Sequence, residues 1–521
     1  MGSADPMKNG ADAPAVPNPA AESLPNKSSS GFVGSVLRLS GGAFIAQALG
    51  FFCAPVTARL FAPDAYGASV LFGSVVVILT VASCLRYELA ILLPKEDKEA
   101  ANLFAVCCIL VAGFTILVAI ALATSGSTFL GWLGASDLDP YKWWLPVNVF
   151  LTGIAFPLNY WNSRQRHFGR LATRQILSTA VGLAGMISGG ALGFQTGGYL
   201  ILMAVLTAAV NALTLAIPLV RHDLEFIRRK VTLADMCQTA RRYVRFPLVD
   251  LWSAMLNVTS LNMPSLLLTA YVGLSVVGLY ARASQLVLMP MRLIGSAIGQ
   301  VFFQRSAAKH ADGEEIGTLT EEVLSRLIAF SLLPVLVTAM IGPEIIIVVC
   351  GDRWAEAGVY AQILTPWLFV LAITSPITGL INTLERLGVG LAFNVVLVVA
   401  RIATLVFAGW YFQSARWMIF LYMIVGTAAN LWMLTYLLRA VRARFGRLLT
   451  FLVRHVAYAI PTLAVAAAVK FWFHLTPWPT LIAVAIATIP YWILAGWHDA
   501  VARGFATRAL ARVRATLREQ P

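Results

Sequence analysis

RHDLEFIRRKVTLADMCQTARRYVR, residues 221–245, is the longest and most polar connection between apolar stretches in this chain. It is rich in arginine, whereas its neighbours, near residues 199–220 and 246–271, are almost entirely apolar. A membrane-spanning helix needs about 20 mostly apolar residues, and cytoplasmic loops retain Lys and Arg. The segment therefore predicts a cytoplasmic loop between two membrane-spanning helices.

Working outward from this loop, the same criterion identifies fourteen apolar stretches. Lysines and arginines crowd into every second connection, whereas the opposite loops, such as residues 195–198 and 273–275, are short and nearly chargeless. This alternation predicts an all-α polytopic protein of the bacterial inner membrane, with both termini in the cytoplasm. The expected spans lie near residues 34–58, 66–92, 100–123, 143–163, 173–194, 199–220, 246–271, 276–303, 323–349, 358–384, 389–412, 417–438, 451–473 and 479–500.

The composition agrees with a membrane protein. Hydrophobic residues make up 59% and charged residues 12% of the chain, and the mean hydropathy is +0.76, which excludes an ordinary soluble domain. The net charge of +14 is confined to alternate loops, so we expect membrane lipids and not nucleic acid as its partner. The six cysteines lack metal-ligand spacing, and neither a metal nor a cofactor is expected.

The polar connection also divides the chain into two parts. Residues 63–67 before it and 274–278 after it form similar short turns that end in Gly. Such repeats are typical of transporters with the substrate site between two lobes. We expect two six-helix pseudo-symmetric lobes around a central cavity, plus two C-terminal helices. The predicted parts are a disordered cytoplasmic tail (1–30), an N-lobe (31–222), a basic cytoplasmic linker (223–245), a C-lobe (246–440), spans 13 and 14 (441–502) and a basic amphipathic cytoplasmic tail (503–521).

Two motifs carry a family resemblance. RYELAILLP at residues 86–94, followed by EAANL at 99–103, resembles the signature after the second span of Wzx-type polysaccharide flippases, in the multidrug/oligosaccharidyl-lipid/polysaccharide exporter superfamily. Residues 246–264 and 278–302 resemble the start of the second lobe in that family, and the likeness covers residues 31–440.

The resemblance implies a secondary transporter, not an enzyme. It implies alternating access that moves an undecaprenyl-pyrophosphate-linked oligosaccharide from the cytoplasmic to the periplasmic leaflet, for synthesis of O-antigen, capsule or exopolysaccharide. It also implies coupling to a proton or sodium ion, and a polymerase and glycosyltransferases of the same pathway as partners.

Charged residues inside apolar spans are costly and normally face a cavity or a charged partner. Because guanidinium groups hold phosphate oxygens bidentately, we expect Arg292 and Arg401 to bind the pyrophosphate. Alternatively, Arg401 and Asp250 neutralise charges within the second lobe, and small polar residues only join helices. The substrate-binding candidates are Arg282, Arg292, Arg401, Asn159, Asn257 and Asn394.

Three further charged residues are candidates for ion coupling or gating in the transport cycle. Asp250, the clearest carboxylate within a span, either binds the coupling ion or forms a buried ion pair, and we favour the ion pair. Arg86 and Glu88 lie at the membrane edge and suggest a cytoplasmic gate or a helix-end anchor.

Three other functions remain open. A MurJ-type lipid II flippase would share the spans and a cationic cavity, but the Arg86 motif favours the polysaccharide branch. A MATE-type drug/cation antiporter usually needs a carboxylate in the core of its first lobe, and the first and fourth spans have none. A membrane glycosyltransferase or polymerase would use the acidic pair Asp137 and Asp139, although a short Asp-Leu-Asp-Pro turn is more often a helix cap.

Overall fold

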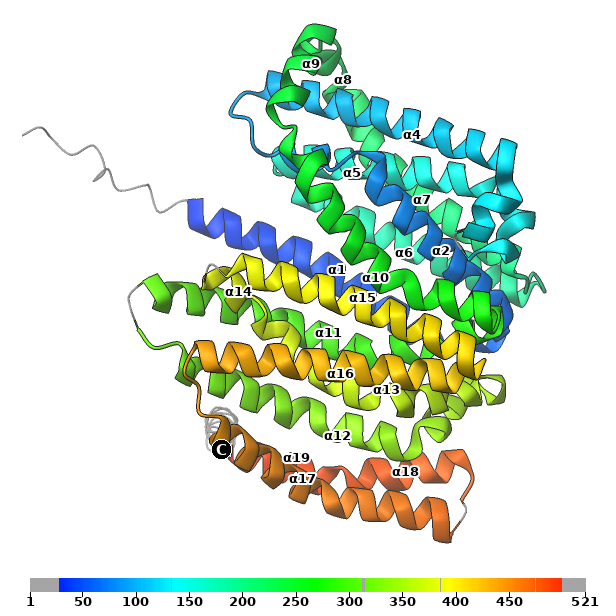
Figure 1. Cartoon of the computed structure of the whole chain (residues 1–521), viewed down its shortest axis with the longest axis vertical. Helices are drawn as coiled ribbons and strands as arrows, with labels where there is room; N and C mark the ends of the chain where they lie inside the picture. Colours follow the sequence, from blue (N-terminus) through cyan, green and yellow to red (C-terminus); the bar gives the residue numbers. More distant parts are fainter. Residues whose placement is uncertain (1–27, 133, 312–313, 385, 474, 499–521) are drawn as a thin grey trace, which may run out of the picture.

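The structure is a computed structural model that describes residues 28–132, 134–311, 314–384, 386–473 and 475–498. Within these residues every assigned element is a helix (Figure 1). The predicted C-terminal tail lies outside the described residues, as does the predicted N-terminal tail apart from residues 28–30, which begin the first helix.

The helices fall into four consecutive sets along the chain. The first set contains α1 (Ser28–Leu60), α2 (Pro63–Ser83), α3 (Tyr87–Ala90), α4 (Asp97–Trp132), η1 (Ser136–Tyr141), α5 (Trp144–Arg164), α6 (Phe168–Ala191) and α7 (Gly197–His222). The connection contains α8 (Leu224–Lys230), α9 (Leu233–Arg242) and the π-helical turn η2 (Phe246–Asp250). The second set contains α10 (Leu251–Tyr271), α11 (Leu274–Ala311), α12 (Gly317–Cys350), η3 (Asp352–Trp354), α13 (Ala355–Thr374), η4 (Ser375–Ile377), α14 (Leu380–Thr383), α15 (Leu387–Phe412) and α16 (Ala415–Ala440). The last set contains α17 (Phe445–Ala467), η5 (Ala468–Trp472), α18 (Pro477–Ala487) and α19 (Ile489–His498).

The expectation of a multi-pass membrane protein is confirmed. Among the described residues, 10 helical segments are long and apolar enough to cross a membrane. Helices α5, α6, α10 and α11 coincide with four further predicted spans and are 21, 24, 21 and 38 residues long. The total of fourteen spans and their division into two lobes stay predictions.

Most helices pack within their own set, and α2 makes the main contacts between the sets. In the first set α1 packs on α6 and α5 on α7, and in the second α12 packs on α13 and α15 on α16. Helix α2 packs against both α10 and α11, and α10 also contacts α15, so α10 touches both sets (Figure 1). Helices α17 and α18 pack against α12 at the edge of the molecule (Figure 1).

The sets come closest where α2 crosses α11. A Cβ atom added at Gly67 would lie 1.9 Å from the carbonyl oxygen of Leu274, and one added at Gly278 would lie 1.9 Å from that of Pro63. Only glycine permits such an approach of two backbones. The two segments that resemble each other in sequence are thus not loops but the first turns of α2 and α11, and they contact each other reciprocally. We call these four residues the crossing end of the interface.

Candidate functional site

A pocket of about 410 Å³ lies between α2, α10 and α15, near the end of α2 opposite to the crossing end. A helix rises about 1.5 Å per residue, so Gly67 at the crossing end and Val81 at the pocket are roughly 21 Å apart along α2. The pocket has both charged and neutral polar groups on its wall. Its polar lining residues are Arg86, Asp250, Ser253, Asn257 and Asn394.

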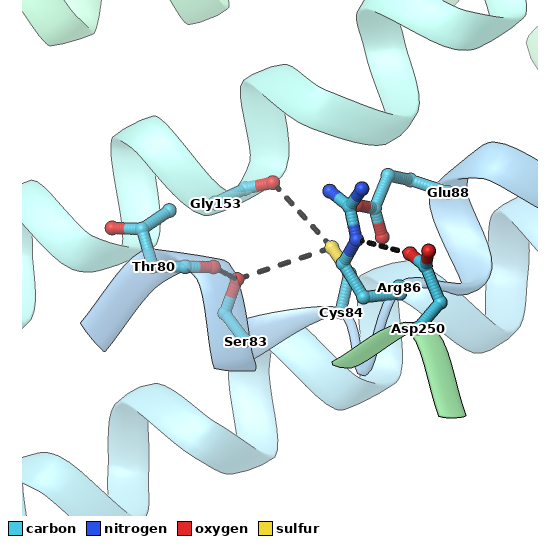
Figure 2. A network of polar contacts seen from close by, with 7 residues as sticks. All are labelled: Thr80, Ser83, Cys84, Arg86, Glu88, Gly153 and Asp250. Carbon is cyan, nitrogen blue, oxygen red and sulfur yellow. Dashed lines mark hydrogen bonds and ion pairs between the residues drawn. The ribbon is translucent and has the colours of Figure 1, made fainter. Parts of the chain in front are cut away.

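An unusual backbone turn places Arg86 at the pocket. Helix α2 ends at Ser83, and both Leu85 and Arg86 adopt left-handed conformations, with φ of 49° and 66°. Each such non-glycine residue costs of order 1 kcal/mol or more, and this strain concentrates at functional sites. Beside the turn, the sulfur of Cys84 lies 3.8 Å from the carbonyl oxygen of Gly153 on α5 (Figure 2). The turn directs the Arg86 side chain away from the axis of α2 and towards η2.

Arg86 bonds two carboxylates that come from different parts of the chain. Its Nε donates to Oδ2 of Asp250 at 2.8 Å, and its Nη1 donates to Oε1 of Glu88 at 3.1 Å (Figure 2). The Glu88 side chain is 2% exposed, that of Arg86 25% and that of Asp250 43%. Asp250 therefore has an ion-pair partner from the first helix set, and not an arginine of the second set as the alternative interpretation supposed.

Burial changes the protonation of this group. Glu88 lies on α3, between the spans Pro63–Ser83 and Asp97–Trp132. Desolvation raises the pKa of Glu88, although the charge of Arg86 opposes the shift. Desolvation lowers the pKa of Arg86, but its bond to Asp250 and the charges of both carboxylates outweigh this effect and raise it. The guanidinium therefore stays charged, and Glu88 ionises less readily than an exposed carboxyl.

The predicted cavity residue Arg282 lies elsewhere. It is 2% exposed, and its guanidinium carbon lies 4.2 Å from the ring centre of Tyr66 and 5.0 Å from that of Trp354. Gln285 Oε1 accepts bonds from Tyr66 at 3.1 Å and, more weakly, from Arg282 at 3.4 Å. Cation–π contacts allow a guanidinium to be buried in this way. Arg282 thus packs beside the crossing end and does not line the pocket.

Arg401 does not line the pocket either. Arg401 is 5% exposed, with its guanidinium carbon 5.2 Å from the ring centre of Trp367 and 4.9 Å from that of Tyr422. These aromatic rings come from α13 and α16, so Arg401 is buried inside the second set. The side chain of Arg292 lies outside the described part of the structure.

The predicted asparagines divide between two places. Asn257 of α10 and Asn394 of α15 both line the pocket, together with Ser253. Asn159 is half-buried on α5 and is not a lining residue of the pocket. The pocket therefore brings together Arg86, Asp250, Asn257 and Asn394, which come from three separate predicted spans.

The fold is shared with solved membrane transporters. The structure titled "Lipid II flippase MurJ, inward closed conformation" superposes with a TM-score of 0.66 at 14% identity, covering 91% of this chain and 99% of that chain. An inward-facing multidrug resistance MATE family transporter of the MOP superfamily gives a TM-score of 0.53 at 17% identity, covering 78% and 99%. An outward-facing MATE structure gives 0.51 at 15% identity, covering 78% and 96%. At these identities the likeness is one of fold.

The sequence defines the family more narrowly. Residues 56–358 match the family model described as "Polysaccharide biosynthesis protein", which is more than half of the chain. This chain belongs to that family of polysaccharide biosynthesis proteins. The resemblance to Wzx-type flippases is thereby confirmed, whereas no curated protein sequence matches the chain.

Proposed function

We propose that this protein is a secondary transporter that flips an undecaprenyl-pyrophosphate-linked oligosaccharide to the periplasmic leaflet for polysaccharide biosynthesis. One observation carries the proposal: a polar pocket of about 410 Å³ lies where the two helix sets meet. Transporters built from repeats bind their substrates at this interface. The polysaccharide biosynthesis family supplies the class of cargo.

The distribution of basic residues supports an orientation for the pocket. We call the end of α2 at the pocket the pocket end. The connection that carries Arg228, Arg229 and Lys230 lies beside it. Helix α9 of this connection packs on α4, and Tyr87 donates to the carbonyl oxygen of Ala240 at 3.0 Å. Basic loops remain in the cytoplasm. The pocket end then faces the cytoplasm and the crossing end faces the periplasm, and Arg86, Glu88 and Asp250 form the cytoplasmic gate.

The Arg86–Asp250 bond favours the ion-pair role of Asp250 over direct ion coupling. A carboxylate bonded to a guanidinium at 2.8 Å is a poor site for a sodium ion, because the arginine already compensates its charge. Coupling to a proton or sodium ion therefore needs another group or the opening of this pair.

A lipid II flippase is the second candidate, because the chain shares the MurJ fold along 91% of its length. A membrane glycosyltransferase is less well supported. Asp139 of its acidic pair bonds Lys142 at 3.1 Å within one helical turn, as a local helix-end contact would. The drug antiporter alternative shares the fold but not the family.

Deletion of the gene in its own bacterium tests the proposal. We expect surface polysaccharide to disappear and lipid-linked oligosaccharide to accumulate in the cytoplasmic leaflet, with both defects reversed by the wild-type gene. Loss of peptidoglycan synthesis with normal surface polysaccharide would instead favour the lipid II flippase. A gene that encodes the Arg86→Gln variant should fail to restore export in the deletion strain. A gene that encodes Arg416→Gln, which alters an exposed arginine paired with Glu356, should restore it.

A further inference from the structure

We infer that Arg86 is the phosphate-binding residue of the pocket, and that Asp250 occupies its guanidinium as a placeholder until the ligand arrives. This inference rests on the proposed function and assigns one part of the ligand, the diphosphate ester of a prenyl-linked glycan. It moves the role expected of Arg401 to Arg86, because Arg86 lines the pocket and, among the described residues, Arg401 is buried elsewhere.

The geometry of Arg86 suits an exchange of anions. Its Nε and Nη1 bond the two carboxylates, whereas Nη2 has no hydrogen-bond partner among the described residues. The planar guanidinium fork matches two oxygens of one phosphate group. A phosphate that takes the place of the Asp250 carboxylate can therefore use Nε and Nη2 together.

The two carboxylates bonded to Arg86 differ in their exposure to water. Asp250 is 43% exposed and ends the π-helical turn η2, so its carboxylate can return to water when it releases Arg86. Glu88 is 2% exposed and one of its oxygens, Oε2, has no partner among the described residues. Glu88 thus acts as a positioning residue that keeps Nη1 in place, while Asp250 is the exchangeable partner.

The other residues of the pocket wall suit the sugar and the prenyl chain, which are the two groups joined by the diphosphate. Ser253, Asn257 and Asn394 offer hydroxyl and amide groups for a sugar. Leu391 and Val395 of α15 are 53% and 39% exposed and offer apolar contact for the first prenyl units. The volume of 410 Å³ lies within the range of about 300–1,000 Å³ found for ligand pockets.

Binding of farnesyl diphosphate to the full-length protein in lipid nanodiscs tests this assignment, with farnesol and inorganic pyrophosphate as companion probes. We expect Arg86→Gln to weaken farnesyl diphosphate binding by about tenfold or more, and Arg86→Lys to weaken it less. Asp250→Asn should tighten binding by about threefold or more, because the placeholder charge is removed. Arg416→Gln, the matched control at a distant ion pair, should leave binding unchanged.

Two outcomes would overturn the inference. Equal affinity of wild-type and Arg86→Gln protein for farnesyl diphosphate removes Arg86 from the site, and weaker binding by Asp250→Asn removes the placeholder role. A gain of affinity in Asp250→Asn cannot come from misfolding, and thermal unfolding checks the other variants. Farnesol binding should not depend on Arg86, whereas inorganic pyrophosphate binding should.

The result is separable from the proposed function. Arg86-dependent binding without glycan export in cells would retain this site and reject the proposed cargo. Export that continues normally in the Arg86→Gln strain, with unchanged diphosphate binding, would retain the function and reject this site.

Discussion

The two ends of α2 meet the second helix set in opposite ways. At the crossing end, Gly67 and Gly278 bring two backbones so close that no Cβ atom fits between them. At the pocket end, Arg86 reaches Asp250 at the edge of a polar pocket of about 410 Å³. One end is held by the close approach of two main chains, whereas the other carries a partly exposed ion pair between the two sets.

This difference indicates which end opens more easily. A partly exposed ion pair contributes roughly 0–1 kcal/mol, because water competes for both charges. Separating α2 from α11 would instead break close backbone packing at small residues, the kind of contact that holds helices together within a bilayer. We therefore expect the pocket end to open more easily than the crossing end, and the following changes test this contrast.

The largest effect is expected at the crossing itself. Gly67→Ala should lower the free energy of unfolding by about 3 kcal/mol, because the new Cβ collides with the carbonyl oxygen of Leu274. Gly73→Ala on the same helix has nothing within 4 Å of the added Cβ and should be neutral or stabilising by up to about 1 kcal/mol. Thermal unfolding of the two purified variants gives the comparison, and equal melting temperatures would contradict a closed crossing.

The next effect concerns the buried Arg282 beside the crossing. Tyr66→Leu removes the ring under the guanidinium and the bond to Gln285, and should cost about 2 kcal/mol. Tyr66→Phe keeps the ring and should cost about 1 kcal/mol. If the two substitutions destabilise the protein equally in chemical unfolding, the cation–π contact contributes nothing.

A smaller effect is expected at the pocket end. Asp250→Asn should change the unfolding free energy by less than about 1 kcal/mol, since the pair it breaks is 25% and 43% exposed. A fully buried pair would instead cost about 3–5 kcal/mol when one partner is removed. Thermal unfolding therefore distinguishes the two cases. A loss of stability as large as that caused by Gly67→Ala would show that the two ends contribute equally to stability.

The smallest effect is a dependence of stability on pH. Burial raises the folded-state pKa of Glu88 above its unfolded value, so the folded protein binds this proton more tightly. Stability should fall as the pH rises from the unfolded pKa through the raised one. Glu88→Gln should remove the part of the slope that lies above the ordinary carboxyl pKa of about 4. An unchanged slope in the variant would assign the dependence to other groups.

The sequence predicts the helices well, because a span needs only a long apolar stretch between polar loops. It also identifies Arg86 and Glu88 as candidates for a gate, and Asp250 as a candidate for ion coupling or an ion pair. It does not predict that Arg86 bonds Asp250, because these residues are 164 positions apart and meet only when α2 packs on α10.

The arginines inside spans show a second limit of sequence reasoning. We expected Arg282 and Arg401 to face a cavity because a charge in a span needs a polar partner. Their partners are aromatic rings from distant segments, Tyr66 with Trp354 and Trp367 with Tyr422. Nothing in the local sequence marks these rings as different from ordinary apolar residues, so the cation–π sites emerge only from the fold.

Flipping of a lipid-linked oligosaccharide in proteoliposomes tests the central claim most directly. Purified wild-type protein should move the labelled glycan lipid across the bilayer, where an added glycan-modifying enzyme detects it. Arg86→Gln protein should be inactive and Arg416→Gln protein should match the wild type. Absence of flipping by the folded wild-type protein, or equal flipping by wild-type and Arg86→Gln proteins, would contradict the account.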